Sequence, residues 1–178
     1  MDTLRLVEPT TDLEAAFRDM AAEWRASGVD RFAEAFGDFA AYVEMLEAQK
    51  DPGSVPPDWV PGTTFWLVTA DGCVVGTSRL RHWLAPDLEQ EGGHIGYDVR
   101  PSERRQGYGT ALLALTLEKA RERGLDEVLV TCDTDNVPSV RVIEKNGGRL
   151  LGQGVSEWSG KQINRYRIVL GPTGDKLT

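Results

Sequence analysis

Residues 104–110 read Arg-Arg-Gln-Gly-Tyr-Gly-Thr and join a predicted strand to the start of a long predicted helix. Amides in the first turn of a helix lack intrahelical acceptors and point outward, which favours anions there. Glycine lets a phosphate approach the main chain, and the two arginines add positive charge. The segment predicts a phosphate-binding loop; taken alone, it also fits a tight turn with solvated arginines.

Two other phosphate motifs do not fit these residues. A Walker loop needs Lys followed by Ser or Thr after its glycines, and no such pair is present here. Leu112 stands where a dinucleotide fingerprint has its third glycine. Nucleoside triphosphates and NAD are therefore not the expected ligands.

Hydrophobic periodicity predicts the elements before the loop. A short strand at 4–8 precedes two helices, and residues 51–62, rich in Pro and Gly, form either a mobile lid or a plain connection. The two helical stripes are Leu13, Phe17, Met20 and Trp24, then Phe32, Phe36, Phe39, Val43 and Leu46.

The rest of the chain alternates strands and helices. A hairpin turn at Asp71 and Gly72 separates two strands, and residues 85–93 are expected to form a polar, acidic loop. The predicted strands are 64–70, 73–84, 94–99, 127–132, 149–153 and 163–170, and the predicted helices are 107–123 and 136–146. This order predicts one α/β domain over residues 1–178 with a mixed sheet.

Composition narrows the classes of function. The formal net charge of -8 opposes binding to nucleic acid. Neither a leader peptide nor a stretch of membrane-spanning length is recognised, so we expect a cytoplasmic protein with no membrane partner. Cys73, Cys132, His82 and His94 do not have the spacing of a metal site, so no metal and two reduced thiols are expected.

Two segments together resemble the GNAT (GCN5-related N-acetyltransferase) superfamily. Residues 92–113 contain its RxxGxG loop as Arg104, Gly107 and Gly109, after a strand that ends in V-x-P at Val99 and Pro101. Residues 131–148 are similar to its NxxSxxxxEKxGG segment, with Asn136, Ser139, Glu144, Lys145, Gly147 and Gly148. The likeness covers residues 64–150 and is greatest to the branch that acetylates ribosomal proteins.

The resemblance implies a fold and a reaction. The fold would be a mostly antiparallel central sheet flanked by helices, with 1–60 as an N-terminal strand and two helices, 64–150 as the acetyl-CoA-binding core and 151–178 as closing strands. The reaction would be direct transfer of acetyl from acetyl-CoA to an amine. The cosubstrate contacts implied are Tyr97, Val99, Arg104, Arg105, Gln106, Gly107, Tyr108, Gly109, Thr110, Asn136 and Ser139.

In such folds the sheet splays between the strand ending at Val99 and the strand ending at Cys132, and the pantetheine chain adds to the open edge. The N–H near Val99 would polarise the thioester oxygen. An amine with a pKa of about 10 must lose a proton before attack. His94, where the branch often has glutamate, is the predicted base, and a histidine satisfied within the sheet is the alternative reading.

The departing thiolate needs a proton or a hydrogen bond. Many members of the family have a tyrosine where this chain has Ile143, so the role passes to Ser139 or to water. Ser139 and Asn136 also fit a purely structural role at a helix N-terminus. Tyr97 and Tyr108 are further donors, for which core packing or contact with adenine is the alternative.

The amine site is the least defined by sequence. Arg81, His82 and Trp83 are the predicted acceptor-binding residues, and Arg79, Trp59 and the acidic run of Asp87, Glu89 and Glu91 could also line the site. The acidic run would favour a cationic amine, and a solvated loop is its plainer reading.

Two other functions stay open beside the enzyme. One is a noncatalytic acyl-CoA-binding or regulatory domain, suggested by Ile143 and by the missing glutamate at position 94. The other is an interaction module whose anion loop is incidental. Acyl groups other than acetyl also stay open, and the closing strands could offer a homodimer edge.

Overall fold

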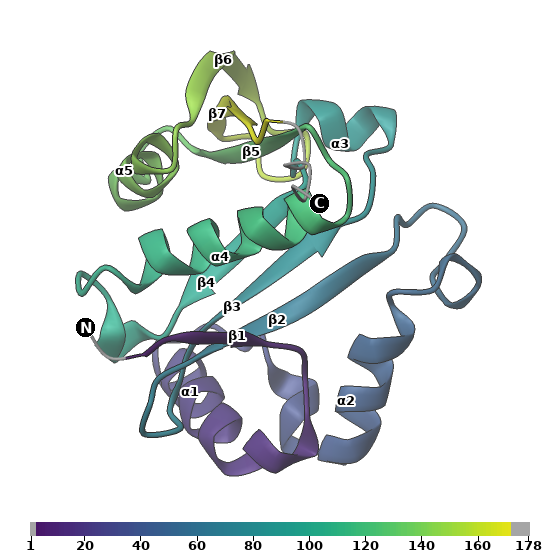
Figure 1. Cartoon of the computed structure of the whole chain (residues 1–178), viewed down its shortest axis with the longest axis vertical. Helices are drawn as coiled ribbons and strands as arrows, with labels where there is room; N and C mark the ends of the chain where they lie inside the picture. Colours follow the sequence, from purple (N-terminus) through teal and green to yellow (C-terminus); the bar gives the residue numbers. More distant parts are fainter. Residues whose placement is uncertain (1–2, 172–178) are drawn as a thin grey trace, which may run out of the picture.

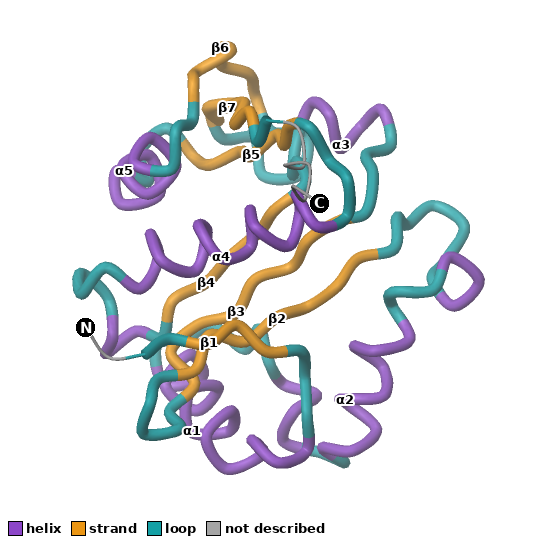
Figure 2. Tube along the Cα trace, viewed as in Figure 1, coloured by secondary structure: helices purple, strands orange, loops and turns teal. Residues whose placement is uncertain are grey.

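The computed structural model describes residues 3–171, whose strands form two separate antiparallel sheets (Figure 1, Figure 2). The first has the order β1-β2-β3-β4 and the second β5-β7-β6. Their bounds are β1 Arg5–Val7, β2 Gly62–Val68, β3 Val74–Arg81, β4 Ile95–Val99, β5 Glu127–Asp133, β6 Arg149–Val155 and β7 Gln162–Val169.

Helices cover both faces of the first sheet (Figure 1). Helices α1 (Glu14–Ala26) and α2 (Phe39–Ala48) lie on one face, and α4 (Tyr108–Glu122) lies on the other. Side chains alternate between the two faces of β2. Trp66 therefore packs in the core under α1 and α2, and Phe65 packs in the core that α4 shares with the second sheet. Helix α5 (Val137–Lys145) packs on α4 and β5, and the short α3 (Pro86–Gln90) precedes β4.

Within residues 3–171, the strands of the two sheets are bridged by backbone pairing only near the start of β4. Gly93 forms an isolated bridge with Val130, and the His94 amide donates to the Leu129 carbonyl at 2.7 Å. A Cβ on Gly93 would lie 2.4 Å from that carbonyl oxygen, and its φ is 62°, so both space and conformation require glycine. Beyond this bridge, no backbone pairing joins β4 to β5 in the described residues, which agrees with the open edge that the family resemblance implies.

The α/β fold class is confirmed, because helices flank antiparallel strands in the described residues. In place of the single mixed sheet that was predicted, the described strands form two sheets whose pairings are all antiparallel. The first strand and the turn at Asp71 and Gly72 are also confirmed, and Gly72 has a φ of 88°. The outer ends of the predicted domain, residues 1–2 and 172–178, lie outside the described residues. No helix in residues 3–171 is both long and apolar enough to span a membrane.

Two sequence predictions need correction. The second stripe is not one helix: residues 33–36 form a 3-10 turn, and α2 begins only after Asp38, whose carboxylate caps it through the Ala41 amide at 3.1 Å. The acidic segment at 85–93 is not all loop, because α3 occupies part of it. Pro86 lies in the first turn of α3 and Leu88 is buried beneath it, which outweighs the polar composition.

Candidate active site

The edge of β4 that faces β5 has free main-chain groups. Arg81 N–H donates to the His94 carbonyl at 2.8 Å and Arg100 N–H to the Val75 carbonyl at 2.9 Å, so even-numbered residues of β4 pair with β3. The N–H and C=O groups of Ile95, Tyr97 and Val99 therefore point away from β3, into the gap between the sheets. An extended chain can hydrogen-bond to this edge as an added strand.

The loop at 104–110 lies at the far end of β4, between Val99 and α4. Arg105 and Gly107 have φ values of 65° and 90°, both left-handed, and Gly107 caps α4 without a side-chain hydrogen bond. Within the described residues, the amides of residues 104–110 donate to no protein acceptor. Left-handed residues that gather free amides at a helix N-terminus create an anion site.

Other loop residues predicted to contact the cosubstrate have defined partners. The Arg104 guanidinium lies 4.9 Å from the centre of the Trp24 ring, and Gln106 donates to the Glu103 carboxylate at 2.8 Å. A Cβ on Gly109 would lie 3.3 Å from Val142, so glycine lets α4 approach α5 closely. Thr110 accepts a hydrogen bond from Asn146 on its carbonyl at 3.2 Å, and Tyr108 packs on the cluster of Leu67, Val75 and Leu112.

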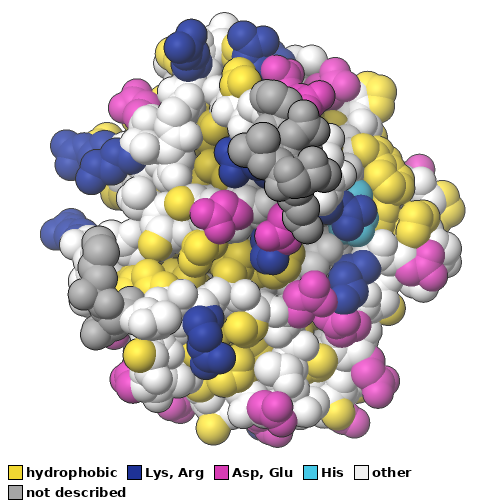
Figure 3. Space-filling view, viewed as in Figure 1, with side chains coloured by type: hydrophobic (Ala, Val, Ile, Leu, Met, Phe, Trp, Pro, Cys, Tyr) yellow, Lys and Arg dark blue, Asp and Glu magenta, His cyan; other side chains and the backbone are white. Residues whose placement is uncertain are grey.

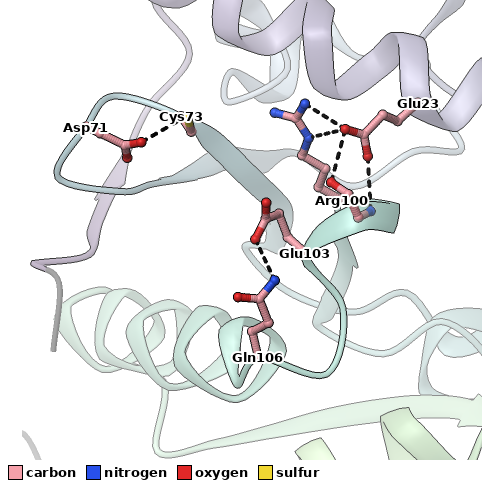
Figure 4. A network of polar contacts seen from close by, with 7 residues as sticks. Glu23, Asp71, Cys73, Arg100, Glu103 and Gln106 are labelled. Atoms are coloured by element: carbon pink, nitrogen blue, oxygen red, sulfur yellow. Dashed lines mark hydrogen bonds and ion pairs between the residues drawn. The ribbon is translucent and has the colours of Figure 1, made fainter.

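A polar network ties the segment before the loop to α1 (Figure 4). One Glu23 oxygen accepts from Arg100 Nε at 2.7 Å and from the Ser102 hydroxyl at 3.0 Å, and the other accepts from the Ser102 amide at 3.0 Å. Burial alone would raise the pKa of Glu23, but the hydrogen bonds from Arg100 and Ser102 outweigh it and leave the pKa lowered. The carboxylate therefore stays ionised and fixes the start of the loop.

His94 lies at the vertex where the sheets meet, not along the gap. Its Nδ1 accepts a hydrogen bond from the Leu129 amide at 3.0 Å, which leaves the proton of the neutral ring on Nε2. Burial, with a smaller effect of Arg81, lowers the pKa of His94 to about 4. The role of base predicted for His94 stays a prediction, and both features argue against it.

Tyr97 and Ser139 approach each other across the gap. The Tyr97 hydroxyl donates to the Ser139 carbonyl at 3.5 Å, and burial raises the pKa of Tyr97 to about 12. Asn136 caps α5 by accepting from the Ser139 amide at 3.2 Å, which is the structural role considered for it. Ile143 is fully buried in the core below α5.

One cleft of about 630 Å³ joins the gap to the face of the sheet covered by α2. Its walls come from residues 31–34, α2, β2, β3, β4, the end of β5 and the start of α5. Among its lining residues are Arg79, Arg81, Gly96, Tyr97, Asp98, Cys132 and Ser139. A group held on the β4 edge and a group held on the α2 side can therefore meet within a single space.

The three residues predicted to bind the acceptor lie in different surroundings. Arg81 lines the cleft, with its Nη1 donating to the Gly93 carbonyl at 2.9 Å. His82 Nε2 instead pairs with the Thr63 hydroxyl at 2.9 Å, and burial, aided by nearby cations, lowers the pKa of His82 to about 4. Trp83 lines a second hollow of about 590 Å³, which shares Trp59 with the cleft.

The surface charges and the groups that could bind a metal bear on which cosubstrate fits the site. On the face shown in Figure 3, acidic side chains lie among the basic ones. Within residues 3–171, no group of three or more His, Cys, Asp or Glu side chains is placed to hold a metal ion. The free amides of the loop and the open β4 edge do fit a phosphate group with an extended chain attached, as in coenzyme A.

Comparison with known proteins agrees with this geometry. Residues 20–148 match the model of the acetyltransferase (GNAT) family. A mycothiol acetyltransferase of Thermobispora bispora is 32% identical over 151 residues, which are 81% of this chain and 45% of the relative. A second, from Clavibacter michiganensis, is 30% identical over 71% of this chain and 39% of its own length. The chain thus spans less than half of these relatives.

Solved structures share the fold. The yncA acetyltransferase of Salmonella typhimurium, determined with acetyl-CoA, has a TM-score of 0.63 at 15% identity over 98% of this chain and 96% of its own. RimL, a ribosomal L7/L12 α-N-protein acetyltransferase solved with coenzyme A, has a TM-score of 0.68 at 16% identity over 97% and 96%. From the family model and the curated relatives, this chain belongs to the acetyltransferase (GNAT) family.

Proposed function

We propose that this protein transfers an acetyl group from acetyl-CoA directly to a primary amine of a small molecule or peptide. The observation that carries the proposal is the junction of an open β4 edge, a loop of free amides and one cleft that reaches the opposite face. Family membership supports acetyl-CoA-dependent acyl transfer, and bound acetyl-CoA would supply the activated thioester.

Each end of the cosubstrate has a defined place in this proposal. The amides of residues 104–110 would bind the pyrophosphate, assisted by the charges of Arg104 and Arg105. The free groups of Ile95, Tyr97 and Val99 would bind the pantetheine chain, with the Val99 N–H available to the thioester oxygen. These roles use main-chain atoms that β3 leaves free.

The amine must lose its proton before it attacks. Because His94 Nδ1 is occupied, we propose that water in the cleft carries this proton away, with Asp98 on the cleft floor as a charged neighbour. Ser139 or the neutral Tyr97 hydroxyl would protonate the leaving thiolate. Ser139→Ala and Tyr97→Phe test the two candidate proton donors. Replacing the residue that supplies the proton should lower kcat about 10-fold or more without weakening acetyl-CoA binding.

A noncatalytic acyl-CoA-binding domain is the second candidate. Ile143 is buried in the core, and His94 is used to join the sheets, so neither supplies an acid or base to the gap. Both functions require donor binding, and only the enzyme requires turnover.

Three further expectations remain proposals. We propose a single domain and a cytoplasmic location. We also propose a homodimer through β6, which is the outer strand of its sheet and exposes Leu150, Leu151 and Val155. Light scattering of the purified protein tests the dimer, and a monomeric mass at high concentration would contradict it.

A panel of amines tests the enzyme proposal. Thiol release from acetyl-CoA is followed with polyamines, amino acids, aminoglycosides, peptides with different N-termini and a mycothiol-related amine, the last because of the relatives' name. Release that matches formation of an N-acetylated product supports the enzyme. Tight donor binding without release from any amine favours the noncatalytic domain.

A further inference from the structure

Arg79 lines the cleft from β3, an interior strand of the first sheet. Its register partners are Thr64 on β2 and Gly96 on β4, and all three residues line the cleft. Gly96 is exposed and a Cβ there would meet nothing within 4 Å, so the space above Arg79 on the β4 side is open. The position is well placed to contact an acceptor rather than the donor, whose phosphate loop lies beyond the other end of β4.

The Arg79 guanidinium is held in place by groups that do not neutralise it. Its Nη1 donates to the side-chain oxygen of Gln49, the residue that ends α2. Its stem lies over Gly62, where a Cβ would be only 3.0 Å from Nε. Among residues 3–171, no carboxylate forms an ion pair with Arg79.

The other charges around the cleft leave this positive charge in excess. Asp98 pairs with Arg31, and Asp133 pairs with Lys161 at 2.8 Å, so two of the three acids that line the cleft are already matched. Glu34 is the third acid. Arg81 is a second cation on the face of β3 that carries Arg79, and Asp87 lies near enough to act on the charge of Arg81, so Arg79 is the cation without a carboxylate partner in the described part of the chain. Burial, then the charge of Arg81, lowers the pKa of Arg79, as expected for a cation that lacks an anion.

A second donor lies on the neighbouring strand. Trp66 is fully buried and lines the same cleft, and its Nε1–H has no acceptor among the described residues. Because this atom has almost no exposed surface, a ligand in the cleft does not reach it, and recognition of an acceptor falls to Arg79.

We propose that the acceptor amine carries a carboxylate and that Arg79 binds this carboxylate, with Gln49 as the residue that positions the guanidinium. The planar fork of arginine matches a carboxylate through two parallel N–H···O bonds. The amine of the same molecule then extends along Gly96 toward the gap. Free amino acids and related carboxylated amines are therefore the substrate class, and polyamines are disfavoured by Arg79 and Arg81. The inference rests on the proposed acetyltransferase function.

Paired acceptors test this selectivity. Phenylalanine, methionine and glutamate are compared with their α-amides, in which only the α-carboxylate is neutralised. We expect kcat/KM to favour at least one acid over its amide by roughly 30-fold, because an unpaired buried cation penalises the amide. Arg79→Gln removes this preference by weakening the acids alone, and Arg167→Gln, at an exposed position of β7, leaves it unchanged. Equal rates for every acid and amide would overturn the proposal.

Gln49→Glu is the sharper variant, because it keeps Arg79 and places a carboxylate where the Gln49 oxygen already accepts its hydrogen bond. It should abolish the preference for acids while leaving the thermal unfolding midpoint unchanged or higher. A purely structural Arg79 predicts that the preference survives this substitution.

Binding measured by calorimetry in the presence of coenzyme A separates this inference from the proposed function. The carboxylate site is supported if carboxylated amines bind the wild type and bind Arg79→Gln at least 10-fold more weakly. This result counts even where no thiol is released. Thiol release from amines together with no effect of Arg79→Gln on binding would overturn the carboxylate site and leave the acetyltransferase standing.

Discussion

His94 Nδ1 accepts a hydrogen bond from the Leu129 amide at 3.0 Å, and the His94 amide donates to the Leu129 carbonyl at 2.7 Å. These two bonds join β4 to β5 at the only point where the two sheets are bridged within residues 3–171. The histidine that the sequence predicts to be a base therefore fixes the point from which the gap between β4 and β5 opens.

Replacing His94 with asparagine separates the two roles. Asparagine has an acceptor oxygen close to the position of Nδ1 but cannot act as a base, so we expect His94→Asn to keep turnover within about 3-fold of wild type. His94→Ala should lose about 1–3 kcal/mol of stability, because the Leu129 amide is left without an acceptor. Steady-state kinetics and urea unfolding measure both effects. A fall in kcat of about 100-fold in folded His94→Asn would restore the base role.

The stability of the protein should fall in mild acid. Burial lowers the pKa of both His94 and His82 to about 4, so each is neutral in the folded protein at pH values where the unfolded chain is already protonated. Their contribution to stability is complete above pH 6.5 and is lost as the pH falls toward about 4.

Urea midpoints between pH 7 and pH 5.5 test this window, in which Asp and Glu contribute little. The double variant His94→Asn and His82→Gln keeps an acceptor for the Leu129 amide and a hydrogen-bond partner for Thr63, and it should flatten the profile. An equally steep profile in the double variant would assign the pH dependence to other groups.

Gly107→Glu should abolish acetyl-CoA binding. The position has a left-handed φ of 90° and begins the helix whose amides form the proposed anion site, so glutamate adds strain and negative charge there. Gly124→Glu is the matched control, because Gly124 has a φ of 84° just beyond the other end of α4. Calorimetry with acetyl-CoA should show lost affinity in the first variant only, and equal affinity in both would remove the loop assignment.

Glu23→Gln should weaken donor binding without altering acceptor recognition. The substitution removes the charge that accepts from Arg100 and Ser102, so the start of the loop loses its anchor on α1. We expect the Kd for acetyl-CoA to rise by about 3- to 10-fold. Glu14→Gln, which breaks the exposed pair with Arg18 on the same helix, should change the Kd by less than about 2-fold. The same small change in both variants would show that the network does not position the loop.

Most helices and strands, and the phosphate-binding loop at 104–110, could be predicted from the sequence because each leaves a local signal in it. The glycines of residues 104–110 indicate a turn because of the local conformations they allow. The apolar stripe of α4 indicates a helix because it follows the helical period. The sequence does not reveal that Glu23, on α1, holds Arg100, because the two are 77 residues apart. The pairings of His94 with Leu129 and of Arg79 with Gln49 depend on tertiary contacts in the same way.

Composition is a weak guide to the short α3 and to the acceptor site. The polar residues at 85–93 read as a loop, but a single buried leucine, Leu88, fixes a helical turn. Likewise, the acidic run suggests a cationic acceptor, although Glu91 is used to bind Ser156 and the Glu157 amide. Of the charged residues predicted to line the acceptor site, Arg79 and Arg81 line the cleft.

Thiol release from acetyl-CoA in the presence of single amines tests the central claim most directly, with product identified by mass spectrometry. We predict that release equals the N-acetylated amine formed, that it requires the amine, and that no acetylated protein accumulates with acetyl-CoA alone. A saturable acetyl-CoA complex that releases no thiol with any amine, or an acetyl group retained on the protein, would contradict direct transfer.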